Sequence, residues 1–208
     1  PGVHTATGPM GQGIAVAEGL ALAARLGRHH DVFTITGDGE LQEGTAWEAV
    51  MYSGDKGLSN LCVIVDNNRG QLDDPTRLHL EATNLADRFA SFGWNVVEVD
   101  GTRYAPVLDA LRAFKDGVRD GRPTAIIART RKGHGGLSVR MQSHKTVLDD
   151  EAIDLEISYQ LRLRAARVAD LNDYLARTPC SDAPETLRRL ADSVRLDLRV
   201  PSPAKRRA

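Results

Sequence analysis

One stretch of the sequence decides the fold: residues 36–71, which read TGDGELQEGTAWEAVMYSGDKGLSNLCVIVDNNRGQ. The stretch contains the ends of two apolar runs, and a polar turn follows each of them. Asp38 stands in the first turn, and Asn68 stands in the second, thirty positions later (38 to 68). That spacing accommodates one crossover helix between two parallel strands. We therefore expect both side chains side by side at the carboxyl ends of neighbouring strands.

The residue types in these turns indicate a clamp for a metal ion and a diphosphate group. Carboxylate and amide oxygens suit a hard cation such as Mg²⁺, which keeps coordination places for ligand phosphates. Gly37 and Gly39 have no Cβ, so backbone N–H groups can approach a phosphate closely. Each turn alone is also typical of an ordinary strand-to-helix connection or asparagine turn. The combination at this spacing favours the functional interpretation.

Size and charge bound the class of protein. The chain has 208 residues, 41% of them hydrophobic, which is enough for one compact α/β domain with or without an appendage. A formal net charge of −1 argues against a nucleic-acid-binding or membrane-seeking surface. Cys62 and Cys180 suggest no disulfide framework. Together with the lack of an apolar run of about 20 residues and of a recognisable signal peptide, this predicts a cytoplasmic protein.

Strand-like and helical segments alternate along most of the chain. Val-, Ile- and Thr-rich runs predict strands at 32–36, 61–66, 95–100 and 124–129. Helices are expected between them, at 12–26, 42–56, 84–92 and 105–119. This alternation predicts an α/β fold, a doubly wound parallel sheet with helices on both faces. Because the strands show little polar alternation, we expect both faces to be buried.

The composition changes near residue 150. Beyond it the sequence is rich in Leu, Arg and Asp and helical in pattern, with helices expected over 150–177 and 185–198. We predict a binding domain at 1–150 and a helical C-terminal extension at 151–208 that carries no chemistry of its own.

Other polar residues are weaker candidates from the sequence alone. Glu43 should lie near a helix N-terminus, where the helix dipole favours a negative charge. Glu48 is five residues further on, so helical spacing does not make the two a catalytic pair. His134 and His144 follow the strand at 124–129, where a loop histidine could touch a ligand or simply be exposed.

Together these motifs resemble the thiamine-diphosphate-binding half of transketolases, especially the N-terminal subunit of two-chain transketolases. The resemblance covers roughly residues 1–151. Its ordered motifs are Pro1-Gly2-Val3, 7–13, 37–44, 47–49, 65–68, 92–94, 99–101, 123–124 and 132–133.

The resemblance implies a set of site residues. Asp38, Asn68 and the Gly70 carbonyl would ligate Mg²⁺ or another divalent cation such as Ca²⁺. The residues expected to bind thiamine diphosphate are Gly8, Met10, Gly37, Gly39, Glu40, Asn68 and His144. His144 would also act in catalysis near the substrate hydroxyl, and Glu43 and Glu48 would link active sites at a subunit interface.

The resemblance also implies an activity and a partner. The expected reaction transfers a two-carbon ketol unit from a ketose phosphate to an aldose, with the cofactor as electron sink. A separate pyrimidine-binding transketolase subunit would complete the site, in a dimer or heterotetramer. Two alternatives stay open: a subunit of a 2-oxoacid decarboxylase or dehydrogenase, and a non-catalytic partner that keeps the fold.

The sequence departs from the family pattern at three places. The family carries cofactor-binding histidines upstream of the segment that opens this chain. Ser143 and Lys145 replace the usual neighbours of His144, and Asp74 replaces a usual glycine.

Overall fold

The structure is a computed structural model of the chain, and it describes residues 3–5, 8–27, 29–71, 84–136 and 149–177. The chain divides into two compact units, Pro1–Ala166 and Arg167–Ala208. The helix expected over 185–198 lies outside the described residues. The domain boundary expected at residue 150 stays a prediction.

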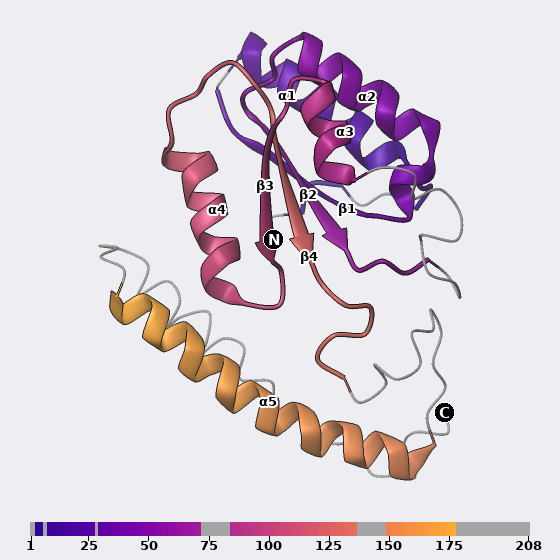
Figure 1. Cartoon of the computed structure of the whole chain (residues 1–208), viewed down its shortest axis with the longest axis vertical. Helices are drawn as coiled ribbons and strands as arrows, with labels where there is room; N and C mark the ends of the chain where they lie inside the picture. Colours follow the sequence, from indigo (N-terminus) through magenta and orange to yellow (C-terminus); the bar gives the residue numbers. More distant parts are fainter. Residues whose placement is uncertain (1–2, 6–7, 28, 72–83, 137–148, 178–208) are drawn as a thin grey trace. The chain divides into compact units, whose positions relative to one another are not determined.

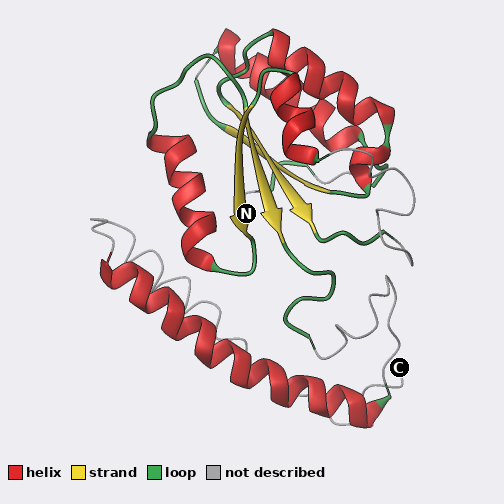
Figure 2. Ribbon diagram, in the orientation of Figure 1, coloured by secondary structure: helices red, strands yellow, loops and turns green. Residues whose placement is uncertain are grey.

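The described elements follow the predicted alternation closely (Figure 2). In chain order they are α1 (Gln12–Leu26), β1 (Val32–Gly37), η1 (Glu40–Gln42), α2 (Gly44–Asp55), β2 (Leu61–Asn67), α3 (Leu85–Ser91), β3 (Asn95–Asp100), α4 (Tyr104–Asp116), β4 (Thr124–Arg129) and α5 (Asp150–Arg177). Helix α2 begins two residues later than expected. The reason is the 3-10 turn η1, which ends at an extended Glu43 (φ −79°, ψ 132°).

The four strands form one parallel sheet in the order β1-β2-β4-β3. Gly37 pairs with Asp66, and Asp66 pairs in turn with Ala128. All the carboxyl ends therefore lie at the same end of the sheet, and the labelled arrows of β2, β3 and β4 point to the same side in Figure 1. The parallel sheet expected from the alternation is confirmed.

Helices α1, α2 and α3 cover one face of the sheet, and α4 packs on the other (Figure 1). The larger core lies under the first three helices and includes Ile14, Val50, Val63 and Phe89. Small residues let α1 approach its neighbours, since Ala17 and Ala21 are buried in this core. The smaller core, under α4, is built around Cys62, Ala110, Phe114 and Ile126.

Coverage of the second face is incomplete among the described residues. The central strands β2 and β4 are mostly buried, whereas the edge strand β1 leaves Phe33 47% and Ile35 73% exposed. The expectation that both faces are buried is thus right for the central strands and wrong for β1 and β3. β3, the other edge strand, stays partly exposed although α3 and α4 both contact it. For β1 the reason is that α4 packs mainly on β3 and β4. It meets β1 through the ring of Phe114, which lies against Phe33 (5.3 Å between centroids).

A search of the described helices for one long and apolar enough to cross a membrane found none.

Candidate functional site

Asp38 lies directly beyond β1, at the edge where the strands end. Its backbone N–H donates to the carbonyl of Asp66 on β2 (3.2 Å), which extends the strand pairing by one residue. The residue is only 4% exposed. Its Oδ1 accepts from the Gly39 N–H (2.9 Å), and its Oδ2 accepts from the Arg69 N–H (2.7 Å). The Asp38 carboxylate therefore lies against the loop that carries Asn68.

Asn68 stands in a tight turn that follows β2. Its Oδ1 accepts from the Gly70 N–H (2.9 Å). Arg69, between the two, has φ of 58°, the one positive φ among the described non-glycine residues. Such a conformation costs about 1–3 kcal/mol and tends to occur at functional sites. The Arg69 N–H reaches the Asp38 Oδ2, so the turn that carries Asn68 lies against Asp38 at the ends of neighbouring strands.

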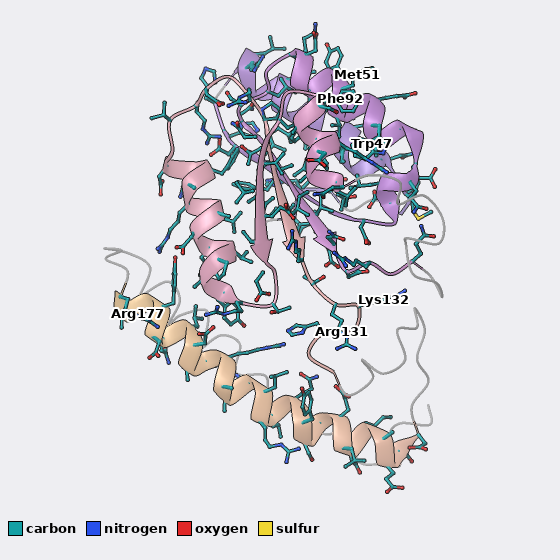
Figure 3. The ribbon with its side chains drawn as sticks, in the orientation of Figure 1. Trp47, Met51, Phe92, Arg131, Lys132 and Arg177 are labelled. Carbon is teal, nitrogen blue, oxygen red and sulfur yellow. The ribbon has the colours of Figure 1, made fainter. Side chains whose placement is uncertain are left out.

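Two long side chains pack across the glycines of the site. A Cβ on Gly39 would lie 3.2 Å from Cγ of Gln71, and one on Gly70 would lie 2.8 Å from Cδ of Lys132. The Gln71 amide donates to Gln42 of η1, and the Lys132 amine donates to the Gln71 carbonyl. Figure 3 labels Lys132 on the loop that follows β4. Both glycines are thus close-approach positions that a side chain would disturb.

The loop before α1 reaches the same site through Glu40. The Glu40 Oε1 accepts from the Gly11 N–H (2.9 Å), and Gly11 has φ of 82°. This bond ties the segment with Gly8 and Met10 to the Gly-Asp-Gly-Glu turn. Both residues are exposed, Met10 by 61%. The structure therefore gives the Glu40 side chain a partner that the sequence did not suggest.

The two glutamates expected at a subunit interface lie at the N-cap and on the exposed side of α2. Glu43 is the N-cap residue of α2, as expected for a charge at a helix N-terminus, but its side chain makes no capping bond. Glu43 and Glu48 are both exposed. A Cβ on Gly11 would lie 2.7 Å from the Cβ of Glu43, so this glutamate borders the start of α1.

The histidine candidates contribute little within the described residues. His144 lies outside them. His134 is exposed in the turn after β4, where its backbone N–H donates to the Arg131 carbonyl (2.7 Å). Their roles stay predictions.

Asp66 and Thr130 also belong to the site, although sequence reasoning gave neither of them a role. The Asn68 Nδ2 donates to the Asp66 Oδ2 (3.0 Å), and the Thr130 hydroxyl donates to the Asp66 Oδ1. The backbone N–H of Thr130 donates to the Asn67 carbonyl (3.1 Å). The signal that could have found Thr130 is its place directly after a strand, but the sequence did not show that β4 lies beside β2.

The donor set fits a hard divalent cation. A carboxylate, an amide oxygen and a backbone carbonyl are ligands that Mg²⁺ accepts, with its other places left for phosphate and water. Carboxylate and amide oxygens each carry two lone pairs, so an oxygen that accepts a hydrogen bond can also ligate a cation. No group of three or more His, Cys, Asp or Glu side chains suited to a metal occurs in the part of the chain that the structure describes.

Comparison with known proteins decides the family. The sequence profile described as "Transketolase, thiamine diphosphate binding domain" matches residues 1–163. The chain belongs to the transketolase family. The turns of Asp38 and Asn68 and all four strands of the sheet lie within the matched residues.

The relatives include proteins named as transketolase subunits and proteins named as transketolases. The chain is 34% identical over 153 residues to a 6-deoxy-6-sulfo-D-fructose transketolase subunit of a Clostridium species, covering 72% of this chain and 55% of that protein. It is 36% identical over 160 residues to an apulose-4-phosphate transketolase subunit of Actinobacillus succinogenes, covering 76% and 57%. The chain therefore spans little more than half the length of these relatives.

A solved structure supports the same assignment. The transketolase of Campylobacter jejuni superposes with a TM-score of 0.65 at 28% identity, over 91% of this chain and 34% of that one. The thiamine-diphosphate-binding α/β fold expected from the sequence is confirmed.

Proposed function

We propose that this chain is the diphosphate-binding part of a thiamine-diphosphate-dependent transketolase. The observation that carries the proposal is the meeting of Asp38 and the Asn68 turn, where the Asp38 Oδ2 accepts from the Arg69 N–H at 2.7 Å. Membership of the family supports it. Relatives named as transketolase subunits or transketolases favour ketol transfer over 2-oxoacid decarboxylation.

The proposed ion is Mg²⁺ or a similar divalent cation such as Ca²⁺. Asp38, Asn68 and the Gly70 carbonyl would hold it, because Asp38 lies against the turn that carries Asn68 and Gly70. Gly37, Gly39 and Glu40 would border the diphosphate, and Gly8 and Met10 would border the aminopyrimidine ring. Bound thiamine diphosphate would supply the electron sink for ketol transfer. This chain's residues would bind and orient it.

A partner chain belongs to the same proposal. Two relatives are named as subunits of transketolases, which supports a division of the enzyme between chains. We infer that a pyrimidine-binding subunit completes the site, in a dimer or heterotetramer, with Glu43 and Glu48 at the contact. Sugar phosphates are the proposed substrates, and the cytoplasm is the proposed location. His144 is the proposed residue for the substrate hydroxyl.

Calorimetry tests the proposal. Thiamine diphosphate is titrated with Mg²⁺ into the chain, alone and together with a pyrimidine-binding transketolase subunit. We expect binding that requires the metal and that Asp38→Ala abolishes, because this change removes the one charged ligand. Glu48→Ala, an exposed change on α2, serves as the control and should bind the cofactor in the absence of the partner as wild type does. Binding that is insensitive to Asp38→Ala, or no binding in either setting, would overturn the proposal.

A further inference from the structure

Asp66 makes two side-chain hydrogen bonds at the end of β2, both as an acceptor. Its Oδ2 accepts from the Asn68 Nδ2 (3.0 Å), and its Oδ1 accepts from the Thr130 hydroxyl on the segment after β4. The other end of the Asn68 amide, Oδ1, accepts from the Gly70 N–H (2.9 Å). We call the turn of Asn68, Arg69 and Gly70 the metal turn, because it carries two of the proposed ligands. Asp66 contacts the NH₂ end of the Asn68 amide, opposite the oxygen that faces this turn.

The chemistry of a carboxylate fixes the direction of that amide. An ionised carboxylate only accepts hydrogen bonds, whereas a side-chain amide has a donating and an accepting end of nearly equal size. Asn68 must therefore turn its NH₂ group toward Asp66, and its oxygen then faces the Gly70 turn. If Asn68 turned the other way, two oxygens would face each other at Asp66, and an NH₂ group would replace the oxygen at the metal turn.

We propose that Asp66 is a positioning residue that makes Asn68 present its oxygen to the cation, and that Thr130 holds Asp66 in place. The inference rests on the proposed function, since it assumes that the Asn68 oxygen is a metal ligand. Groups that orient metal ligands typically contribute 10–100-fold in metal affinity. Asp66 thus couples β2 and β4 to the metal turn without touching the cation.

The first test needs no cofactor. Asp66→Asn keeps the size of the side chain but allows it to donate or accept, so only the Gly70 N–H still favours one direction of the Asn68 amide. In ¹⁵N NMR of the full chain, the Asn68 side-chain amide should show slow hydrogen exchange in the wild type and faster exchange in Asp66→Asn. Asp100→Asn is the matched control, because Asp100 ends β3 at the same edge and accepts from the Thr102 hydroxyl (2.6 Å). The control should leave the Asn68 amide unchanged.

The second test measures metal affinity. Mn²⁺ is titrated in the presence of thiamine diphosphate and followed by electron paramagnetic resonance. We expect Asp66→Asn to weaken Mn²⁺ binding about 10–100-fold, with an unchanged unfolding midpoint and wild-type cofactor binding at saturating Mn²⁺. Thr130→Val should weaken Mn²⁺ binding less than Asp66→Asn does. Thr130→Ser keeps the hydroxyl group and should bind Mn²⁺ as the wild type does.

The outcomes separate this inference from the proposed function. Equal Mn²⁺ affinity in wild type and Asp66→Asn, or equal losses in Asp66→Asn and Asp100→Asn, would overturn the inference alone. Unchanged exchange of the Asn68 amide in Asp66→Asn would also overturn it. A wild type that holds the amide fixed but binds neither Mn²⁺ nor thiamine diphosphate would overturn the proposed function, and with it the role of Asp66 toward a cation.

Discussion

Arg69 shows what the metal turn demands of a single residue. Its φ of 58° places its backbone in the left-handed region, which lets its N–H reach the Asp38 Oδ2 at 2.7 Å. The side chain itself is exposed. The conformation, rather than the guanidinium group, is therefore what the site uses.

Substitutions of Arg69 test that conclusion. A β-branched residue tolerates a left-handed backbone poorly, so Arg69→Val should lower the free energy of unfolding by about 1–2 kcal/mol. Arg69→Gly accepts this conformation without a clash and should be close to wild type in stability. Chemical denaturation of both variants measures the difference. Equal effects of the two changes would contradict a strained backbone at this position.

At the scale of elements, close contact between helices and turns holds the site's framework. A Cβ on Gly54 of α2 would lie 1.9 Å from the carbonyl oxygen of Phe92, so α2 touches the turn between α3 and β3. Trp47 of α2 packs its ring against Phe92 (6.3 Å between centroids), and both are labelled in Figure 3. On the other side of α2, the Ser53 hydroxyl donates to the Glu18 carboxylate of α1 (3.2 Å).

Two glycines in helices give a matched pair of alanine substitutions. Gly54→Ala should destabilise the chain by about 1–3 kcal/mol, because the added methyl forces α2 away from the Phe92 carbonyl. Gly19→Ala in α1 meets nothing within 4 Å, and it should stabilise the chain by about 0.5–1 kcal/mol through lower backbone entropy in the unfolded state. Thermal unfolding measures both. A Gly54→Ala variant as stable as Gly19→Ala would refute the close contact.

The Glu18–Ser53 contact predicts a pH dependence. Burial raises the pKa of the Glu18 carboxyl above its ordinary 4.5, and the hydrogen bond from Ser53 partly offsets the effect. A raised acid pKa means that the folded state binds the proton more tightly, so stability is lost as the pH rises from 4.5 through the folded pKa. Glu18→Gln keeps a hydrogen-bond acceptor for Ser53. Its free energy of unfolding, compared with that of the wild type at the same pH, should be higher at neutral pH than at about pH 3. Chemical denaturation at several pH values measures this difference. A difference in unfolding free energy that stays constant from acid to neutral pH would contradict the raised pKa.

At the scale of the whole molecule, the sequence predicted the strands of the sheet better than their order or the contacts around the site. Alternation of strands and helices was enough to predict four parallel strands, and the spacing of Asp38 and Asn68 was enough to predict that the two turns emerge from neighbouring strands. It could not predict that β4 lies between β2 and β3, since strand order depends on which apolar surfaces pack together. For that reason Thr130, which reaches the site from the segment after β4, was given no role from the sequence, and Lys132 was noted only within the family motif at 132–133. The hydrogen bond from the Gly11 N–H to Glu40 could not be predicted either, because every residue except proline has a backbone N–H and the residue type does not show which one donates.

The partly covered sheet face makes a prediction about association. Phe33 and Ile35 are exposed on β1, an edge strand with an apolar face, and such strands promote self-association. We expect the isolated chain to associate with copies of itself through this face as its concentration rises. Ile35→Glu should reduce the association, whereas Val118→Glu, at a position 99% exposed outside the sheet, should not. Sedimentation velocity over a concentration series measures it, and equal behaviour of the two variants would exclude this face.

The central claim is that Asp38 and the Asn68 turn hold one divalent cation. Anomalous diffraction from crystals grown with thiamine diphosphate and Mn²⁺ measures the position of that ion directly. The account predicts one strong peak bound by side-chain oxygens of Asp38 and Asn68 and by the Gly70 carbonyl, with diphosphate oxygens completing its coordination. A bound cofactor whose Mn²⁺ peak lies away from these three residues would contradict it.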